Sequence, residues 1–136
     1  MTTFVDTSGV IALLSTADAH HAEAVATWKS LVESRTRLVT TDLVLAETVM
    51  VARSRAGFDL SVSAGDRLLR PPFEIVWVER PLLDAAWSLY RRYSDHVLSL
   101  CDCVSFALMR IRRIETAFTY DADFDAVGFS HARSGG

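Results

Sequence analysis

A short apolar run that ends in an acid and leads at once into a helical pattern sets the main constraint on this chain. Phe4 and Val5 precede Asp6, and two hydroxyl residues and a glycine separate that acid from the next apolar run. This order predicts a buried strand, a tight turn and a helix capped by Ser8. In open α/β sheets, ligands bind outside the carboxyl ends of strands, so Asp6 is a candidate for chemistry. An acid here also has a purely structural explanation, because Asp commonly ends strands and caps helices.

Strand and helix patterns alternate along the rest of the chain. Strands are predicted at 4–5, 37–41, 74–78, 116–120 and 127–130, and helices at 8–14, 22–32, 42–56, 60–68, 81–92 and 99–109. Such alternation calls for a parallel sheet between helical layers, and right-handed crossovers bring successive strand ends to one edge. Half of the 136 residues are apolar, which is enough for one core. We therefore expect a single α/β domain over residues 1–136.

The composition argues against several classes of protein. The formal net charge of -3 argues against a protein that coats nucleic acid through bulk electrostatics. A local basic patch could still bind nucleic acid. No apolar run approaches the ~20 residues of a membrane span, which predicts a cytoplasmic protein without a membrane partner. Cys101 and Cys103 are the only cysteines and have no histidine at ligand spacing. We interpret both as reduced core residues and not as zinc ligands.

Glu47 is an anomaly in the predicted helix at 42–56. It lies one turn from Val44 and from Val51, so it shares a stripe with apolar residues. Burying a lone carboxylate is costly, so such a residue normally has a partner or lines a polar cleft. The alternative is a wide apolar stripe with Glu47 at its solvated edge.

Asp102 lies in the first turn of the apolar helix predicted from Ser99 onward. It is the only charged residue between His96 and Arg110. A helix with so few charges must lie at the centre of the fold. Ser99 and Asp102 also form a capping-box pattern, which gives the acid a structural explanation. Both interpretations stay open on the sequence.

Three alternating acids follow the predicted strand at 116–120. Asp121, Asp123 and Asp125 have the spacing of a calcium loop. The EF-hand pattern requires Gly at its sixth position and Glu at its twelfth, where this chain has Ala126 and Ala132, so we exclude it. The remaining interpretation is a second set of acids at the carboxyl end of a strand.

The predicted helix at 81–92 carries several aromatic side chains. Leu83, Ala86, Trp87 and Tyr90 recur at helical spacing as one face. That spacing favours a buried face over a platform for stacking nucleotides.

Together the acids predict a metal site. Asp6 and Asp121 should share one edge of the sheet, and Glu47 and Asp102 lie on helices that could overhang it. Four converging carboxylates cannot all stay ionised without a cation, and the only lysine is Lys29. Oxygen ligands at this density favour Mg²⁺ or Mn²⁺, which promote attack of water on phosphodiesters.

Four segments of the chain match the motifs of one family. They are 4–8, the apolar helix around Glu47, 98–102 and 119–124. In order and spacing they resemble the motifs of PIN-domain nucleases, and above all those of the small VapC-type toxins of bacterial toxin-antitoxin pairs. The resemblance implies a PIN-like three-layer α/β/α sandwich with a mostly parallel sheet, and a homodimer. It also implies a magnesium-dependent endoribonuclease that cuts tRNA or ribosomal RNA and is inhibited by a cognate antitoxin whose tail fills the acidic groove.

The resemblance also assigns site residues. The acidic quartet corresponds to Asp6, Glu47, Asp102 and Asp121, with Asp123 as a further metal ligand and Ser8 and Ser99 as supporting hydroxyls. The loop could present either Asp121 or Asp123 as the fourth ligand. Cysteines flank Asp102 where the family more often has threonine and alanine. The implied roles are metal anchoring by three of the aspartates and completion of the shell, or orientation of water, by Glu47.

Alternatives from other classes fit less well. A receiver domain needs a lysine late in the chain, and a haloacid-dehalogenase-like phosphatase needs a second Asp where Ser8 stands. A catalytically silent PIN-fold module that binds RNA or protein is the stronger alternative.

Five arginines are candidates for holding flanking phosphates, although each is also explained as a solvated helix end: Arg53, Arg55, Arg110, Arg112 and Arg113.

Overall fold

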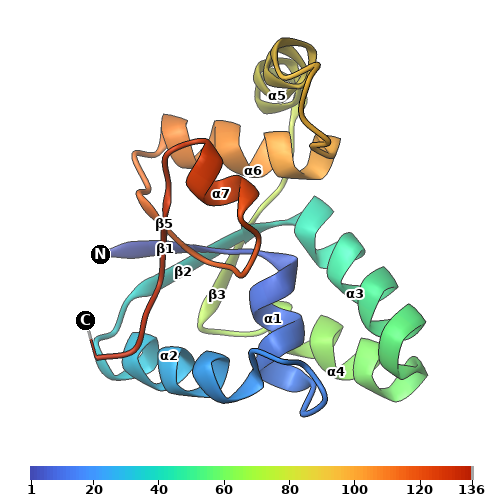
Figure 1. The fold of residues 1–136 in the computed structure, drawn as a ribbon, viewed down its shortest axis with the longest axis vertical. Coiled ribbons are helices and arrows are strands. Elements are labelled where there is room, and N and C mark those ends of the chain that lie inside the picture. Colours follow the sequence, from blue (N-terminus) through green and yellow to red (C-terminus); the bar gives the residue numbers. More distant parts are fainter. Residues whose placement is uncertain (136) are drawn as a thin grey trace.

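A five-stranded sheet in which every pairing is parallel forms the centre of the protein, with helices on both faces (Figure 1). The structure is a computed structural model that describes residues 1–135. The strand order is β3-β2-β1-β4-β5, with β1 at the centre. The strands are β1 (Thr2–Val5), β2 (Arg37–Thr41), β3 (Phe73–Val76), β4 (Thr116–Phe118) and β5 (Ser130–His131). The predicted α/β/α sandwich with a parallel sheet is confirmed.

Seven helices connect and cover these strands. They are α1 (Thr7–Leu14), α2 (His21–Glu33), α3 (Asp42–Ala56), α4 (Phe58–Leu68), α5 (Arg80–Arg92), α6 (Leu100–Ile111) and α7 (Asp123–Ala126). The short α7 was not predicted. It begins where the carboxylate of Asp121 accepts a hydrogen bond from the Asp123 amide at 2.9 Å, a local bond that turns the chain.

Several predicted boundaries were wrong by a few residues. The N-cap of α1 is Asp6, whose side chain accepts from the Ser8 amide, and not Ser8 itself. Strand β4 ends at Phe118 because the Tyr120 amide donates to the Ser8 hydroxyl at 2.8 Å and not to a neighbouring strand. Strand β3 ends at Val76, and the Val78 amide donates to Asp42 instead. The last strand begins at Ser130, after α7.

Alternating residues of the central strands pack in two separate hydrophobic cores, one on each face of the sheet. Phe4, Val39 and Ala117 pack in the core under α5, α6 and α7. Their neighbours Val5, Leu38 and Phe118 pack in the core under α1, α2 and α4. Successive side chains of a strand point to opposite faces, so both faces of the sheet are sealed. Figure 1 shows the two helical layers on either side of the strands.

Helix α5 covers only α6 and leaves its aromatic side chains in solvent. Ala86 and Leu89 are its buried residues. Trp87 is 50% exposed and Tyr90 is 43% exposed. The prediction that these two rings belong to the buried face was wrong. Helix α5 lies on the outer side of α6, and only a narrow face of α5 packs against the core (Figure 1).

Helix α1 crosses the end of β4 at very short range. A Cβ atom on Gly9 would clash with the carbonyl oxygen of Phe118 and lie 2.9 Å from its carbonyl carbon. Glycine in a helix is about 1 kcal/mol less favourable than alanine, so this close approach accounts for its presence. Among residues 1–135, no helix is long and apolar enough to cross a membrane.

Candidate functional site

A hollow of about 480 Å³ opens at the carboxyl edge of the sheet, and the predicted acids line it. Side chains from β1, α1, α3, α6 and the loop after β4 meet there. The sequence-predicted residues on its wall are Asp6, Ser8, Glu47, Ser99, Asp102, Asp121 and Asp123. Of the five arginines considered for phosphate binding, Arg55 alone is among its lining residues within the described part of the chain. Arg112 instead forms an ion pair with Glu74 at 3.4 Å.

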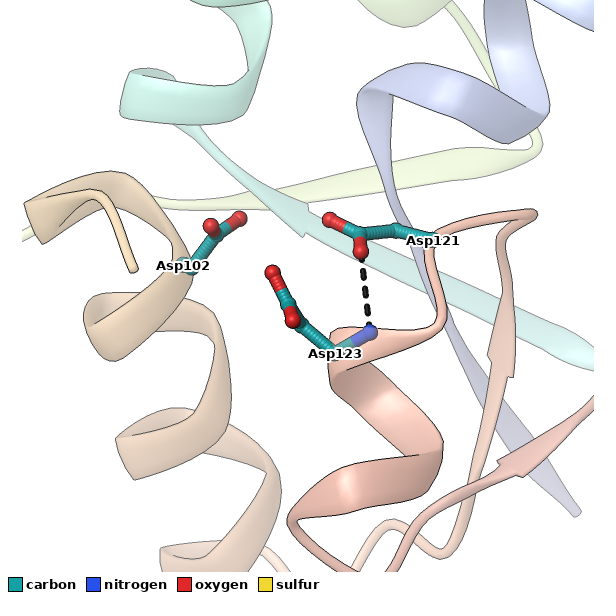
Figure 2. Close-up of side chains that lie close together, drawn as sticks. All are labelled: Asp102, Asp121 and Asp123. Atoms are coloured by element: carbon teal, nitrogen blue, oxygen red, sulfur yellow. Dashed lines mark hydrogen bonds between the residues drawn. The ribbon is translucent and has the colours of Figure 1, made fainter. Parts of the chain in front are cut away.

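Three aspartates form the tightest group in the hollow. One carboxylate oxygen from each of Asp102, Asp121 and Asp123 lies within 4.8 Å of the other two. Figure 2 shows Asp102 on its helix facing Asp121 in the loop after β4 and Asp123 at the start of α7. The sequence left the choice between Asp121 and Asp123 open, and the structure brings both to Asp102. Asp6 and Glu47 line the same hollow but stand outside this group.

Asp6 is buried at the end of β1, with an exposed fraction of 4%. Its Oδ2 atom accepts hydrogen bonds from the Ser8 hydroxyl and from the Thr119 hydroxyl, each at 2.9 Å. Burial raises the pKa of Asp6, the two hydroxyl donors lower it in part, and the charges of Glu47 and Asp121 raise it further. Asp6 is thus held in one orientation, and a nearby positive charge would favour its ionised form.

The same two hydroxyls join the ends of β1 and β4. The Ser8 hydroxyl accepts from the Tyr120 amide at 2.8 Å, and the Thr119 hydroxyl accepts from the Asp121 amide at 3.1 Å. Thr119 was not singled out from the sequence. The available signal was its position as a hydroxyl residue at the end of an apolar run, two residues before an acid. Thr119 therefore links the buried acid of β1 to the backbone that carries Asp121.

Asp102 combines a structural bond with a place in the acidic group. Its Oδ2 accepts from the Ser99 amide at 3.3 Å, and its own amide donates to the Ser99 hydroxyl at 3.0 Å. The predicted capping box is confirmed. Partial burial raises the pKa of Asp102 to about 6, with the charges of Asp6 and Asp121 adding to the rise and the bonds to Ser99 opposing it. Asp102 therefore caps α6 and still presents a carboxylate oxygen to Asp121 and Asp123.

Glu47 and Cys101 complete the surroundings. Glu47 is half-buried on α3, and the next residue on that helix, Thr48, donates to the Thr7 hydroxyl at 3.1 Å. This bond fixes α3 against α1. Burial raises the pKa of the Cys101 thiol, and the charges of Glu47, Asp102 and Asp6 raise it further. The thiol stays protonated, so oxygen atoms are the donors that this site offers. Both cysteines are free, as predicted.

The donor set fits a hard divalent cation. Three carboxylate groups converge, and the pKa of Asp123 is raised first by burial and then by the charge of Asp121. Burial and the neighbouring carboxylate both disfavour the ionised form of Asp123, and a bound cation would offset both. Clustered oxygen ligands of this kind suit Mg²⁺ or Mn²⁺ better than softer metals.

We expect Thr119→Val to destabilise the protein by about 1–3 kcal/mol. Valine keeps the shape but removes the donor to Asp6 and the acceptor for the Asp121 amide, and both groups lie in a buried region. Urea unfolding monitored by circular dichroism at neutral pH measures the loss. Thr116→Val, at the half-buried start of β4, three residues before Thr119, is the matched control. Equal stability of the two variants would contradict a linking role for Thr119.

We expect the stability of the metal-free protein to respond to pH through Asp102. Its folded-state pKa of about 6 lies above the value of 3.8 for an ordinary carboxyl, so between these values the folded state binds more protons than the unfolded state. Its contribution to stability is therefore greatest below about pH 4 and is lost as the pH rises through about 6.

Asp102→Asn tests this pH response. The variant removes the charge and keeps an acceptor for Ser99. After a discount for partial exposure, it should be more stable than the parent by about 1 kcal/mol above pH 7 in chelator, and equally stable near pH 4. Thermal melts across this range measure the difference. A difference that does not change with pH would contradict the assignment.

Comparison of the sequence with known proteins identifies its family and its relatives. The model of the PIN domain matches residues 3–130. The chain is 34% identical over 130 residues to the 23S rRNA-specific endonuclease VapC20 of Mycobacterium tuberculosis, and the match covers 96% of this chain and 97% of that protein.

Solved structures give the same result for the fold. The crystal structure of M. tuberculosis VapC20, described as a toxin that cleaves the sarcin-ricin loop, superposes with a TM-score of 0.87 at 33% identity, over 97% of this chain and 99% of that one. VapBC2 from Rickettsia felis, bound to a promoter DNA fragment, has a TM-score of 0.71 at 13% identity, over 96% and 97% of the two chains. The second likeness concerns the fold alone.

Proposed function

Because this chain belongs to the PIN-domain family, we propose that it is a divalent-metal-dependent endoribonuclease of the VapC toxin type. The observation that carries the proposal is the convergence of Asp102, Asp121 and Asp123 in a hollow that Asp6 and Glu47 also line. The likeness to a 23S rRNA-specific endonuclease along nearly the whole chain favours ribosomal RNA over tRNA as the substrate.

The proposed roles follow from where each side chain lies. Asp102, Asp121 and Asp123 would hold Mg²⁺ or Mn²⁺. When bound, the ion would lower the pKa of a water molecule and offset charge on the scissile phosphate. Asp6 adds a fixed negative charge at the base of the hollow, oriented by the hydroxyls of Ser8 and Thr119.

The remaining polar residues of the hollow orient the substrate and the attacking water. The half-buried Glu47, on the wall of the hollow, would accept a hydrogen bond from that water. Ser99 would keep Asp102 in place through the capping box. Arg55 lines the same hollow and would contact a phosphate that flanks the cleaved bond.

We further propose that activity is controlled by a cognate antitoxin in a cytoplasmic complex, with the chain acting as a homodimer. The likeness to VapC20 supports an antitoxin partner through the toxin class of that protein. The excess of carboxylates in the hollow gives a physical basis for such control, because a basic side chain of a partner placed there would neutralise the charge that the cation needs.

The test is incubation of the purified protein with total cellular RNA in magnesium, in manganese and in chelator. We expect discrete ribosomal RNA fragments with either metal and none in chelator. Asp6→Asn should abolish the fragments. Asp125→Asn is the matched control, because this acid is exposed beside His131, outside the three-aspartate group. Binding of metal and RNA without cleavage of any RNA would favour the catalytically silent module.

A further inference from the structure

A second hollow, of about 530 Å³, lies between α5 and the start of α6. We call it the aromatic hollow. Its wall contains the rings of Trp87, Tyr90, Tyr93 and His96, together with Arg91. Trp87 and Tyr90 lie one turn apart on α5 with ring centroids 5.4 Å apart and planes 11° apart, so the two rings stack on each other as one aromatic pair. Tyr93 and His96 meet edge to face at 5.6 Å.

The aromatic hollow lies next to the acidic one. Val97 and Leu98 line both, so the short segment before α6 forms the ridge between them. Val97 is fully exposed on this ridge, and Leu98 is buried beneath it. A chain that runs out of the acidic hollow across this ridge would therefore reach the aromatic rings next.

The rings are exposed although they are large and apolar. Trp87 is 50% exposed and Tyr90 43% exposed, and Arg91 beside them enters none of the ion pairs found among residues 1–135. Packing in the core does not account for these side chains, since the buried residues of α5 are Ala86 and Leu89. Flat rings next to a free guanidinium are the groups that bind nucleobases and phosphates.

We propose that the aromatic hollow binds an unstacked nucleobase of the RNA substrate, one that flanks the scissile phosphodiester. The base stacks on the Trp87–Tyr90 surface, and Arg91 contacts the adjoining phosphate. The inference rests on the proposed nuclease function, which it deepens by giving the substrate a second point of attachment. It also specifies the kind of RNA that is cut, because such a base must lie in a loop or bulge and not in a regular duplex.

A second copy of this chain is the other occupant that an exposed aromatic face could have. Three features favour RNA. The surface is hollowed, it carries an arginine that forms no ion pair within residues 1–135, and it adjoins the acidic hollow where the phosphodiester would lie. An interface between copies would require none of these.

The first test measures binding of a labelled oligoadenylate of about 12 nucleotides, a length that covers one site. All variants are made in the Asp102→Asn background with magnesium, so that cleavage is too slow to consume much RNA during the measurement. Trp87→Ala and Trp87→Leu should weaken binding about tenfold, and Trp87→Phe should restore most of it, because stacking requires a ring. Trp77→Ala is the matched control, since Trp77 is also exposed but lines a different hollow.

The second test measures cleavage of ribosomal RNA by the same Trp87 variants in the otherwise native chain. We expect a higher KM with little change in kcat, and an unchanged affinity for Mn²⁺. The binding test does not depend on cleavage, so failure of the proposed function leaves it readable. Oligoadenylate binding that is absent, or equal in Trp87→Leu and Trp87→Phe, would overturn the nucleobase site. So would a shift from dimer to monomer in Trp87→Ala with unchanged RNA binding, which would assign the face to a second copy.

Discussion

Asp102→Asn should lower the rate of RNA cleavage by about 10²–10³-fold, the usual effect of removing one charge-stabilising group from an active site. The asparagine oxygen can still accept from the Ser99 amide, so the start of α6 is preserved. The charge that faces Asp121 and Asp123 is lost. A fixed-time assay on ribosomal RNA, with circular dichroism as the check on folding, measures the effect.

Two further results would separate a role in the metal site from a general loss of structure. The affinity for Mn²⁺, measured by calorimetry, should fall about tenfold or more in Asp102→Asn. The variant should also be more stable than the parent in chelator at neutral pH, since it removes a carboxylate whose ionised form is disfavoured by burial and by the charges of Asp6 and Asp121. Asp125→Asn should show neither change. An Asp102→Asn protein that cuts RNA at the parental rate would refute the assigned role.

Gly9→Ala should destabilise the protein by at least about 2 kcal/mol, although alanine is the better helix former. The added methyl group would clash with the backbone of Phe118, which cannot rotate away as a side chain could. Relief requires α1 to move away from β4, and this would stretch the bonds from Thr119 to Asp6 and from Tyr120 to Ser8. Cleavage should therefore fall together with stability. Chemical denaturation gives the free energy of unfolding.

Gly65 provides the matched control in another helix. A Cβ atom there would meet a methyl group of Val49 at 3.4 Å, which is ordinary contact. Gly65→Ala should therefore be neutral or stabilise α4 by up to about 1 kcal/mol. If both alanine variants are equally stable, the close approach of α1 to β4 is not what requires glycine at position 9.

The arrangement of the sheet was predictable because its pattern is local. Phe4 and Val5 are followed by an acid, and the same sequence of apolar run and acid recurs at Asp121, so parallel strands had to bring these acids to one edge. The capping box at Ser99 was equally local. These features depend on spacing within a few residues, which a sequence displays directly.

Other features depend on contacts between distant segments and were missed. The role of Thr119 arises from its bond to Asp6, which is contributed by the other end of the chain. The exposure of Trp87 and Tyr90 depends on how many neighbours α5 has, and helical spacing cannot show that number. Helix α7 begins with a side-chain bond inside a run of acids that carries no apolar periodicity.

The pairing of β1 with β4 also determines when the site can exist during synthesis. β1 and Asp6 leave the ribosome first, whereas β4, Thr119 and two of the three clustered aspartates are among the last parts of the fold to emerge. Until then Asp6 lacks one of its hydroxyl donors and Asp102 has no carboxylate partners. A nascent chain of this kind cannot assemble its acidic hollow while most of it is being translated.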